Sequence, residues 1–262
     1  FNTMHLLVWI VFFTLLGGAL SVLVAAVFLC LPEDGRNRIL PHGVSFAIGT
    51  LLSASFNGLI PHAFEGADSA KLHALSLTIL AGILIFFLLE KFLLWRHSHR
   101  GSGHAHEAQE NPDREPSGTL ILLGDAIHNF VDGVLIGAAF LTDIHLGIVT
   151  SLAVATHEIP QEVGDFAILL NSGYRRGQAL LWNVLASITT VFGGLAAYFA
   201  LRKLDSLLPY LLVFAASSFI YIAVADLIPT LNRETDSKST LYQILLIAAG
   251  VAMIFLSHRF AH

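Results

Sequence analysis

Two short stretches of the sequence combine imidazole, carboxylate and carboxamide side chains at helical spacing. The first holds Asp125, His128, Asn129 and Asp132, which stand at positions i, i+3, i+4 and i+7. At about 100° per residue, these positions share one face of a helix. The donor set suits Zn²⁺, Mn²⁺ or Fe²⁺, whereas the lack of thiolate and thioether donors disfavours Cu⁺. The stretch therefore predicts one half of a divalent-metal site.

The second stretch supplies a matching polar face. Its polar side chains are His157, Glu158, Gln161, Glu162 and Asp165. At the same angular step they fall within roughly 140° of one helix face. Pro160 lies in the middle of this stretch and cannot donate a hydrogen bond to the carbonyl of Thr156, so we expect a bend there.

Both stretches lie inside apolar segments, at 119–141 and 146–171, that are long enough to cross a bilayer. Ionisable side chains are costly in lipid and are found there facing a cavity, a partner or an ion. A lone histidine would be read as a hydrogen-bonded interior residue. Two aligned stripes with two histidines and several carboxylates instead predict a metal pathway near mid-bilayer, where transporter sites lie.

The composition indicates a polytopic membrane protein. The chain has 262 residues, of which 55% are hydrophobic and 13% are charged, whereas a soluble domain carries about 25% charged residues. The first apolar run lacks a basic flank and is too long for a signal peptide. We expect an all-α fold with eight transmembrane helices, at 6–31, 43–62, 74–95, 119–141, 146–171, 178–201, 207–229 and 240–257.

Charge and cysteine content narrow the partners. The single cysteine, Cys30, provides neither a disulfide framework nor a thiolate metal cage. With 14 Lys and Arg residues and no basic cluster, the chain is not expected to bind nucleic acid. Most of these basic residues lie in the connections that are inside when both termini are outside, which predicts that orientation in the bilayer.

One long connection, residues 97–118, is rich in histidine. It contains His97, His99, His104 and His106 and has no apolar periodicity. We expect a disordered cytoplasmic loop that captures metal loosely, within a single transmembrane domain covering 1–262. The alternative, a loop that is merely soluble, stays open.

The tripeptide Leu-Ile-Pro occurs at 59–61 and again at 227–229, near the ends of the second and seventh apolar runs. With eight spans these two runs cross in opposite directions, which favours inverted repeats of the kind found in transporters. Chance recurrence in an apolar chain is an equal alternative. Asp226, Asn57 and His62 lie close to these tripeptides and are further candidates for lining the pathway.

An enzyme motif is also present in part. His157-Glu158 followed by Gln161 begins like the zincin signature His-Glu-x-x-His, but the second histidine is absent and Pro160 interrupts the helix that the motif needs. An intramembrane metallohydrolase is therefore a minor alternative. A divalent-cation channel or exporter would use the same ligands and stays open.

The stretches His128-Asn-Phe-Val-Asp132-Gly133 and His157-Glu-Ile-Pro-Gln161-Glu-Val-Gly-Asp165 resemble the signature fourth and fifth helices of the ZIP family of divalent-metal transporters, in its prokaryotic form. The resemblance implies uptake of Zn²⁺, or alternatively Fe²⁺ or Mn²⁺, into the cytosol, without enzymatic activity or a cofactor. It also implies inverted three-helix repeats around helices four and five, a homodimer, and a multi-pass location in the plasma (inner) membrane.

The resemblance further implies which residues hold metal. The predicted ligands, over a primary and a neighbouring site, are His128, Asn129, Asp132, His157, Glu158, Gln161 and Glu162. The primary site would use the two histidines with Asp132 and Gln161.

Three positions depart from the family pattern, and one of them is Val131, which stands where some members have Pro. Gln161 stands where many members have His or Glu, and Thr190 stands where members with a two-metal centre have Glu. Glu162 is an extra carboxylate, either a ligand or an acceptor that orients a histidine. Because two neighbouring divalent ions need several carboxylates to offset their repulsion, we expect one dominant metal site.

Overall fold

The structure, a computed structural model, describes residues 3–100, 115–201, 204–231 and 237–259. All regular elements in these ranges are helical. This is the expected outcome for apolar segments in lipid, because a helix satisfies its own backbone hydrogen bonds.

The described elements group into eight consecutive helical segments. They are α1 (Thr3–Gly17) with α2 (Ala19–Phe28); α3 (Glu33–Ser53) with η1 (Ala54–Leu59) and α4 (Ile60–Phe64); α5 (Ser69–Arg100); α6 (Glu115–Thr142); α7 (Ile144–Asn171); α8 (Arg176–Ser187) with α9 (Thr189–Leu201); η3 (Asp205–Leu207), α10 (Leu208–Tyr221), η4 (Ile222–Leu227) and α11 (Ile228–Leu231); and α12 (Ser237–Arg259).

Seven of these segments are long and apolar enough to cross a membrane. The remaining one is α7, which has sufficient length but carries the ionisable residues between His157 and Asp165. The apolar pattern that predicted eight spans is therefore confirmed for seven of them. Pro160 lies inside α7, and the helix continues through it to Asn171.

The helices extend into both ends of the loop that the sequence predicted at 97–118. Helix α5 continues to Arg100 and α6 begins at Glu115. Residues 101–114, which include His104 and His106, lie outside the described residues.

Two segments change helix type just before a proline. The π-helices η1 and η4 each end at the leucine of a Leu-Ile-Pro tripeptide, Leu59 and Leu227. Proline lacks a backbone N–H, so the turn before it loses an α-helical hydrogen bond, and a π-turn is one way to adjust the backbone there. The repeated tripeptide thus marks a repeated local structure.

Helix α6 packs against α9 with their backbones in contact. A Cβ atom added to Gly133 would lie 1.9 Å from the carbonyl oxygen of Thr190, and one added to Gly193 would lie 2.0 Å from that of Phe130. Glycine on both helices is what permits this approach, as in other membrane helix pairs. The contact fixes the position of α6, and therefore of the polar face that it carries.

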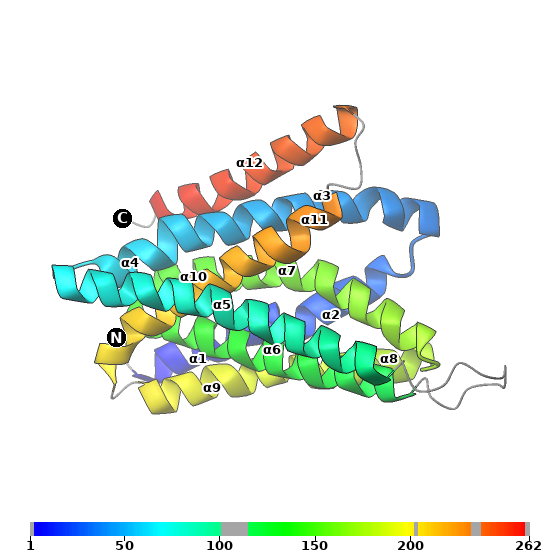
Figure 1. The fold of residues 1–262 in the computed structure, drawn as a ribbon, viewed down its shortest axis with the longest axis horizontal. Helices are drawn as coiled ribbons and strands as arrows, with labels where there is room; N and C mark the ends of the chain where they lie inside the picture. The colour runs from blue at the N-terminus through cyan, green and yellow to red at the C-terminus, as the bar shows by residue number, and fades with distance from the viewer. Residues whose placement is uncertain (1–2, 101–114, 202–203, 232–236, 260–262) are drawn as a thin grey trace.

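Glycine residues likewise allow the backbones of α3 and α12 to approach closely. A Cβ atom on Gly49 would lie 2.1 Å from the Ile247 carbonyl oxygen, and one on Gly250 would lie 2.4 Å from that of Phe46. Figure 1 shows α12 alongside α3 at one edge of the molecule, with α6 and α9 at the other.

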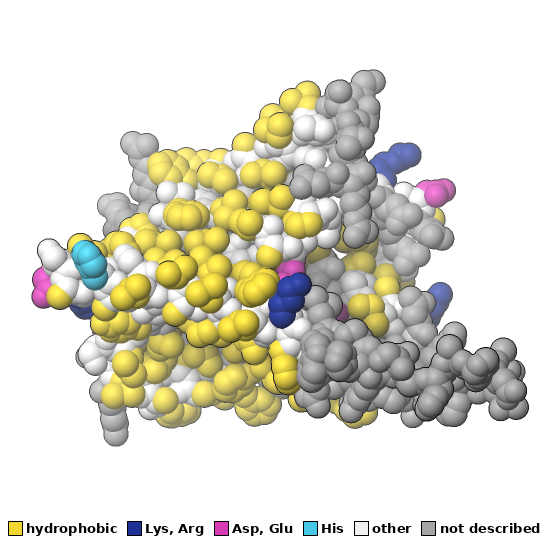
Figure 2. Space-filling view, viewed as in Figure 1, with side chains coloured by type: hydrophobic (Ala, Val, Ile, Leu, Met, Phe, Trp, Pro, Cys, Tyr) yellow, Lys and Arg dark blue, Asp and Glu magenta, His cyan; other side chains and the backbone are white. Residues whose placement is uncertain are grey.

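Helices α5 and α12 form the periphery. Only 11% of the most apolar stretch of each is buried, compared with 67% for the α3–α4 segment. Hydrophobic side chains accordingly cover much of the face shown in Figure 2. This surface suits contact with lipid chains.

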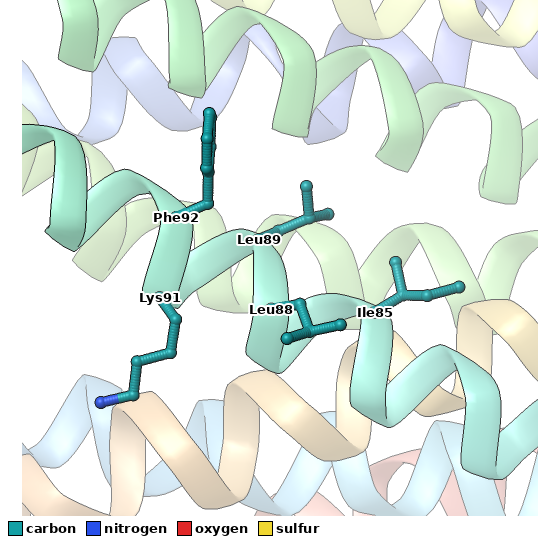
Figure 3. Close-up of a pocket in the computed structure, with 5 residues that line it drawn as sticks. All are labelled: Ile85, Leu88, Leu89, Lys91 and Phe92. Atoms are coloured by element: carbon teal, nitrogen blue, oxygen red, sulfur yellow. The ribbon is translucent and has the colours of Figure 1, made fainter.

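A shallow apolar depression of about 700 Å³ lies along α5. Its lining comes from that one helix, as Figure 3 shows: Ile85, Leu88, Leu89, Lys91 and Phe92. Lys91 also lies 5.8 Å from the ring centre of Phe87. None of these lining residues belongs to the two polar stripes.

Candidate metal site

Helices α6 and α7 are neighbours, and their polar stripes meet. His157 Nε2 lies 3.2 Å from an oxygen of Asp132 and 3.5 Å from an oxygen of Glu158. His128 Nε2 lies 3.3 Å from the same Glu158 oxygen and 3.8 Å from the same Asp132 oxygen. We call these four residues the mixed cluster. One ligand atom from each lies within 4.8 Å of all the others.

The mixed cluster is buried. Asp132 and Glu158 are fully buried, His157 is 1% exposed, and the side chain of His128 is 23% exposed. Both imidazole Nε2 atoms and all four carboxylate oxygens lack a hydrogen-bond partner among the described residues. Buried polar groups are normally paired, and unpaired charges are the costliest exceptions. A cation placed between these donors would satisfy all four residues.

The tautomer of His157 suits metal binding. Its Nδ1 atom lies 3.1 Å from the carbonyl oxygen of Ala153, one turn earlier on α7. A carbonyl only accepts, so Nδ1 carries the proton and donates it to that oxygen. In the neutral imidazole this leaves the Nε2 lone pair directed at the cluster, which is the usual arrangement of a metal-bound histidine. Two nitrogen and two oxygen donors match a tetrahedral Zn²⁺ site.

A second group of acidic residues, which we call the carboxylate cluster, adjoins the mixed cluster and offers oxygen donors alone, which suit ions such as Mn²⁺. Asp125, Glu158 and Glu162 each present an oxygen within 4.8 Å of the other two. Glu158 belongs to both groups. The hydroxyl of Ser187, on α8, donates a hydrogen bond of 2.8 Å to Glu162.

Asn129 lies between helices with its amide group fully engaged. Its Nδ2 donates to Asp125 Oδ1 at 2.8 Å, and its Oδ1 accepts from the Thr190 hydroxyl at 2.8 Å. The Thr190 hydroxyl therefore positions Asn129, which in turn donates to Asp125. The sequence named Asn129 as a ligand; in the structure it connects α6 to α9.

Some predicted residues come together and others lie apart. His128, Asp132 and His157 lie together as expected. The fourth member of the cluster is Glu158, whereas the sequence predicted Gln161 as the fourth ligand of the primary site. Gln161 is partly buried, one turn along α7. Asp125 shares the α6 stripe, so its spacing was the signal that could have placed it among the candidate ligands.

The candidates near the Leu-Ile-Pro tripeptides lie outside both groups. Asn57 donates to the hydroxyl of Ser53 at 3.0 Å, and His62 Nδ1 lies 2.9 Å from the Gly58 carbonyl oxygen. Asp226 is exposed on η4. His62 also lines a cavity of about 430 Å³ among the ends of α4, α6 and α10.

Comparisons with known proteins agree on one family. The family model described as "ZIP Zinc transporter" matches residues 3–119 and 96–258. The chain is 34% identical to zinc transporter ZIP13 of Pongo abelii over 233 residues, covering 83% of this chain and 66% of the relative. It is 32% identical to human ZIP13 over 265 residues, covering 83% and 70%.

A third relative, human zinc transporter ZIP4, is 33% identical over 282 residues, covering 84% of this chain and 43% of the relative. The chain therefore spans about two thirds of the length of these ZIP13 proteins and less than half of ZIP4.

Proposed function

The chain belongs to the ZIP zinc transporter family, and from this premise we propose that it carries divalent metal ions, chiefly Zn²⁺, across a membrane into the cytosol. The ion would bind between α6 and α7. The observation that carries the proposal is the mixed cluster, whose four buried residues present donor atoms that lack hydrogen-bond partners. Because this is a family of transporters, the metallohydrolase alternative is set aside.

Charge and donor type support zinc as the main cargo. Asp132 and Glu158 together carry two negative charges, which offset one divalent ion when the imidazoles are neutral. Imidazole nitrogen favours Zn²⁺ and Fe²⁺ over Mg²⁺ or Ca²⁺. The His128 side chain is partly exposed although its Nε2 atom is buried, so this side of the cluster lies closer to the molecular surface than the other three residues.

We further propose eight membrane spans arranged as two inverted three-helix repeats around α6 and α7. Three correspondences support this. The first and sixth segments are each broken into two helices, α1/α2 and α8/α9. The second and seventh segments each contain a π-helix, η1 and η4. The eighth segment, α12, packs on α3 of the second, just as the third segment, α5, packs on α10 of the seventh. Each correspondence pairs a segment with the one five places later.

The remaining features rest on the resemblance and on charge distribution. Helix α1 begins and α12 ends at the same end of the molecule in Figure 1, which is consistent with both termini outside. A homodimer, the plasma (inner) membrane and a His-rich cytoplasmic loop stay predictions. So does the prokaryotic form of the family, to which the vertebrate relatives lend no support.

Transport into proteoliposomes loaded with a metal-sensing dye tests the proposal. We expect saturable uptake of Zn²⁺, with weaker uptake of Fe²⁺ or Mn²⁺, and loss of uptake in Asp132→Asn. Asp34→Asn, which removes an exposed carboxylate at the start of α3, is the matched control. Absence of Zn²⁺ uptake by the well-folded wild type would refute the proposal, and unitary conductance in planar bilayers would indicate a channel instead.

A further inference from the structure

We propose that Thr50, on α3, is a positioning residue for metal binding: it keeps the imidazole of His157 turned so that Nε2 faces the mixed cluster. The inference rests on the proposed function, because it concerns how firmly the transported ion is held. Thr50 lies on neither polar stripe and is not a member of the mixed cluster. It belongs to a segment more than a hundred residues earlier in the chain than α7.

A chain of polar contacts leads from α3 to the imidazole. Thr50 is fully buried, and its Oγ1 atom lies 2.6 Å from Oγ1 of Thr156 on α7. The Thr156 oxygen in turn lies 2.9 Å from the carbonyl oxygen of Ala153. The same carbonyl oxygen lies 3.1 Å from His157 Nδ1. The hydroxyl of Thr50 is thus connected to the hydrogen bond that fixes the tautomer of His157.

The carbonyl oxygen of Ala153 is surrounded by more donors than it serves well. In an α-helix this oxygen accepts the backbone N–H of the residue four positions later, which here is His157. A carbonyl oxygen has two lone pairs, so one is left for a side chain. The Thr156 hydroxyl and the His157 Nδ1–H group both lie within reach of it. These two donors therefore compete, and the outcome decides whether the imidazole is anchored.

Thr50 settles this competition because it offers the Thr156 proton another acceptor. Each hydroxyl carries one proton, and two hydroxyl oxygens 2.6 Å apart share a hydrogen bond. Thr50 Oγ1 also lies 2.9 Å from the carbonyl oxygen of Ala47, on α3 itself. When Thr50 donates to that carbonyl and accepts from Thr156, the Ala153 carbonyl is left to His157. Each of the three donors then has its own acceptor. Without the Thr50 hydroxyl, the acceptor that remains for Thr156 is the Ala153 carbonyl.

Packing around the imidazole leaves its orientation to this hydrogen bond. The ring centre of His157 lies 6.0 Å from that of Phe219, on α10, and 5.7 Å from that of His128. These contacts limit where the ring lies. A half-turn about the Cβ–Cγ bond nevertheless exchanges nitrogen for carbon while the ring keeps nearly the same shape. A turned ring presents carbon to the cluster in place of Nε2, so the Nδ1 hydrogen bond decides whether His157 acts as a ligand.

X-ray absorption at the zinc edge tests the inference, because it counts the imidazoles bound to Zn²⁺ in the purified full chain. We expect two in the wild type and one in Thr50→Val, which keeps the shape of the side chain but removes its hydroxyl. Zinc affinity should fall about tenfold, as for other residues that orient metal ligands. The apparent KM for uptake should rise by the same factor. Thr50→Ser, which restores the hydroxyl, should restore the second imidazole and the affinity.

Thr14→Val is the matched control. It removes an equally buried threonine hydroxyl whose hydrogen bonds go to carbonyl oxygens of its own helix, α1. Its thermal unfolding measures the cost of losing such a hydroxyl, and it should bind zinc with two imidazoles, as the wild type does.

A double variant separates positioning from stability. Adding Thr156→Val to Thr50→Val removes the competing donor, so two imidazoles should again bind zinc although a further hydroxyl is lost. If Thr50→Val does not fold, Thr50→Ala makes the same comparison, alone and with Thr156→Val. Two bound imidazoles in a folded variant that lacks only the Thr50 hydroxyl, or no recovery in the folded double variant, would overturn the inference. Failure of the proposed function would instead show as absence of zinc uptake by the wild type.

Discussion

The mixed cluster and the carboxylate cluster occupy the same two helices yet differ in their surroundings. The mixed cluster has two nitrogen donors, and one of its histidines is partly exposed. The carboxylate cluster has oxygen donors alone and receives hydrogen bonds from Asn129 and from Ser187 on α8. One pair of membrane helices can thus present two coordination chemistries a turn apart. The difference is that the carboxylate cluster receives a hydroxyl donor from the neighbouring helix α8 and an amide donor from Asn129 of α6 itself.

The largest effect is expected where the two clusters overlap. Glu158→Gln preserves shape but removes the charge that both clusters share, so Zn²⁺ and Mn²⁺ binding should both collapse and zinc uptake should fall to background. Isothermal titration with each ion, alongside liposome uptake, measures this, with Asp34→Asn as control. Loss of only one ion would show that Glu158 serves a single cluster.

Asp132→Ala should separate the clusters. Asp132 contacts both histidines and lies outside the carboxylate cluster, so its removal should abolish Zn²⁺ uptake while Mn²⁺ still binds. The protein should remain folded by size-exclusion chromatography. Near wild-type uptake by this variant would mean that the mixed cluster is not the transport site.

Selectivity should shift when nitrogen is replaced by oxygen. His157→Gln keeps a neutral donor but removes an imidazole, so the ratio of Zn²⁺ to Mn²⁺ uptake should fall about tenfold, the order of change expected from donor type. Competition uptake with both ions in one vesicle sample gives the ratio directly. An unchanged ratio would place discrimination elsewhere in the pathway.

A smaller, graded effect is expected from Asn129→Ala. This change leaves Asp125 and Thr190 without their partner, at a cost of about 1–3 kcal/mol in folding stability. Mn²⁺ affinity should fall about tenfold, as for other residues that orient metal ligands, and Zn²⁺ affinity should fall less. If Zn²⁺ affinity suffers more, Asn129 acts as a ligand of the mixed cluster, as the sequence first suggested.

The smallest effect should come from deleting residues 97–107, which include four histidines. They precede α6 by several residues and belong to neither cluster, so the apparent KM for zinc should change modestly and the maximal uptake rate should not. A well-folded deletion without uptake would show that the segment takes part in transport itself.

The sequence predicted those parts of the site that depend on residue spacing within one helix. The i, i+3, i+4 pattern placed His128 and Asp132 on one face, and the match between two adjacent stripes paired them with His157. Contacts between segments far apart in the chain could not be predicted from the sequence. The Thr190 to Asn129 bond and the Ser187 to Glu162 bond join residues far apart in the chain, and helix packing alone decides them.

The fold likewise has features that the sequence predicted and features that it did not. Apolar runs predicted the helices, and the repeated Leu-Ile-Pro raised the question of internal symmetry. The π-helices η1 and η4 were not foreseen, because an extra residue in a helical turn leaves no distinct composition. Similarly, nothing in the apolar pattern showed that Gly133 and Gly193 let two backbones touch, since glycine in a membrane helix has several uses.

Sharing Glu158 makes the two clusters thermodynamically interdependent. An ion in the mixed cluster would be stabilised by the same Glu158 charge that would stabilise an ion in the carboxylate cluster. The two ions would also repel each other, so the coupling between their binding free energies is negative. By linkage, Zn²⁺ must weaken Mn²⁺ affinity by the same factor by which Mn²⁺ weakens Zn²⁺ affinity. A pair of sites coupled in this way holds each ion firmly only while the other is absent. Arrival of a second ion then lowers the barrier to departure of the first, as in pores where ions displace one another from adjacent sites.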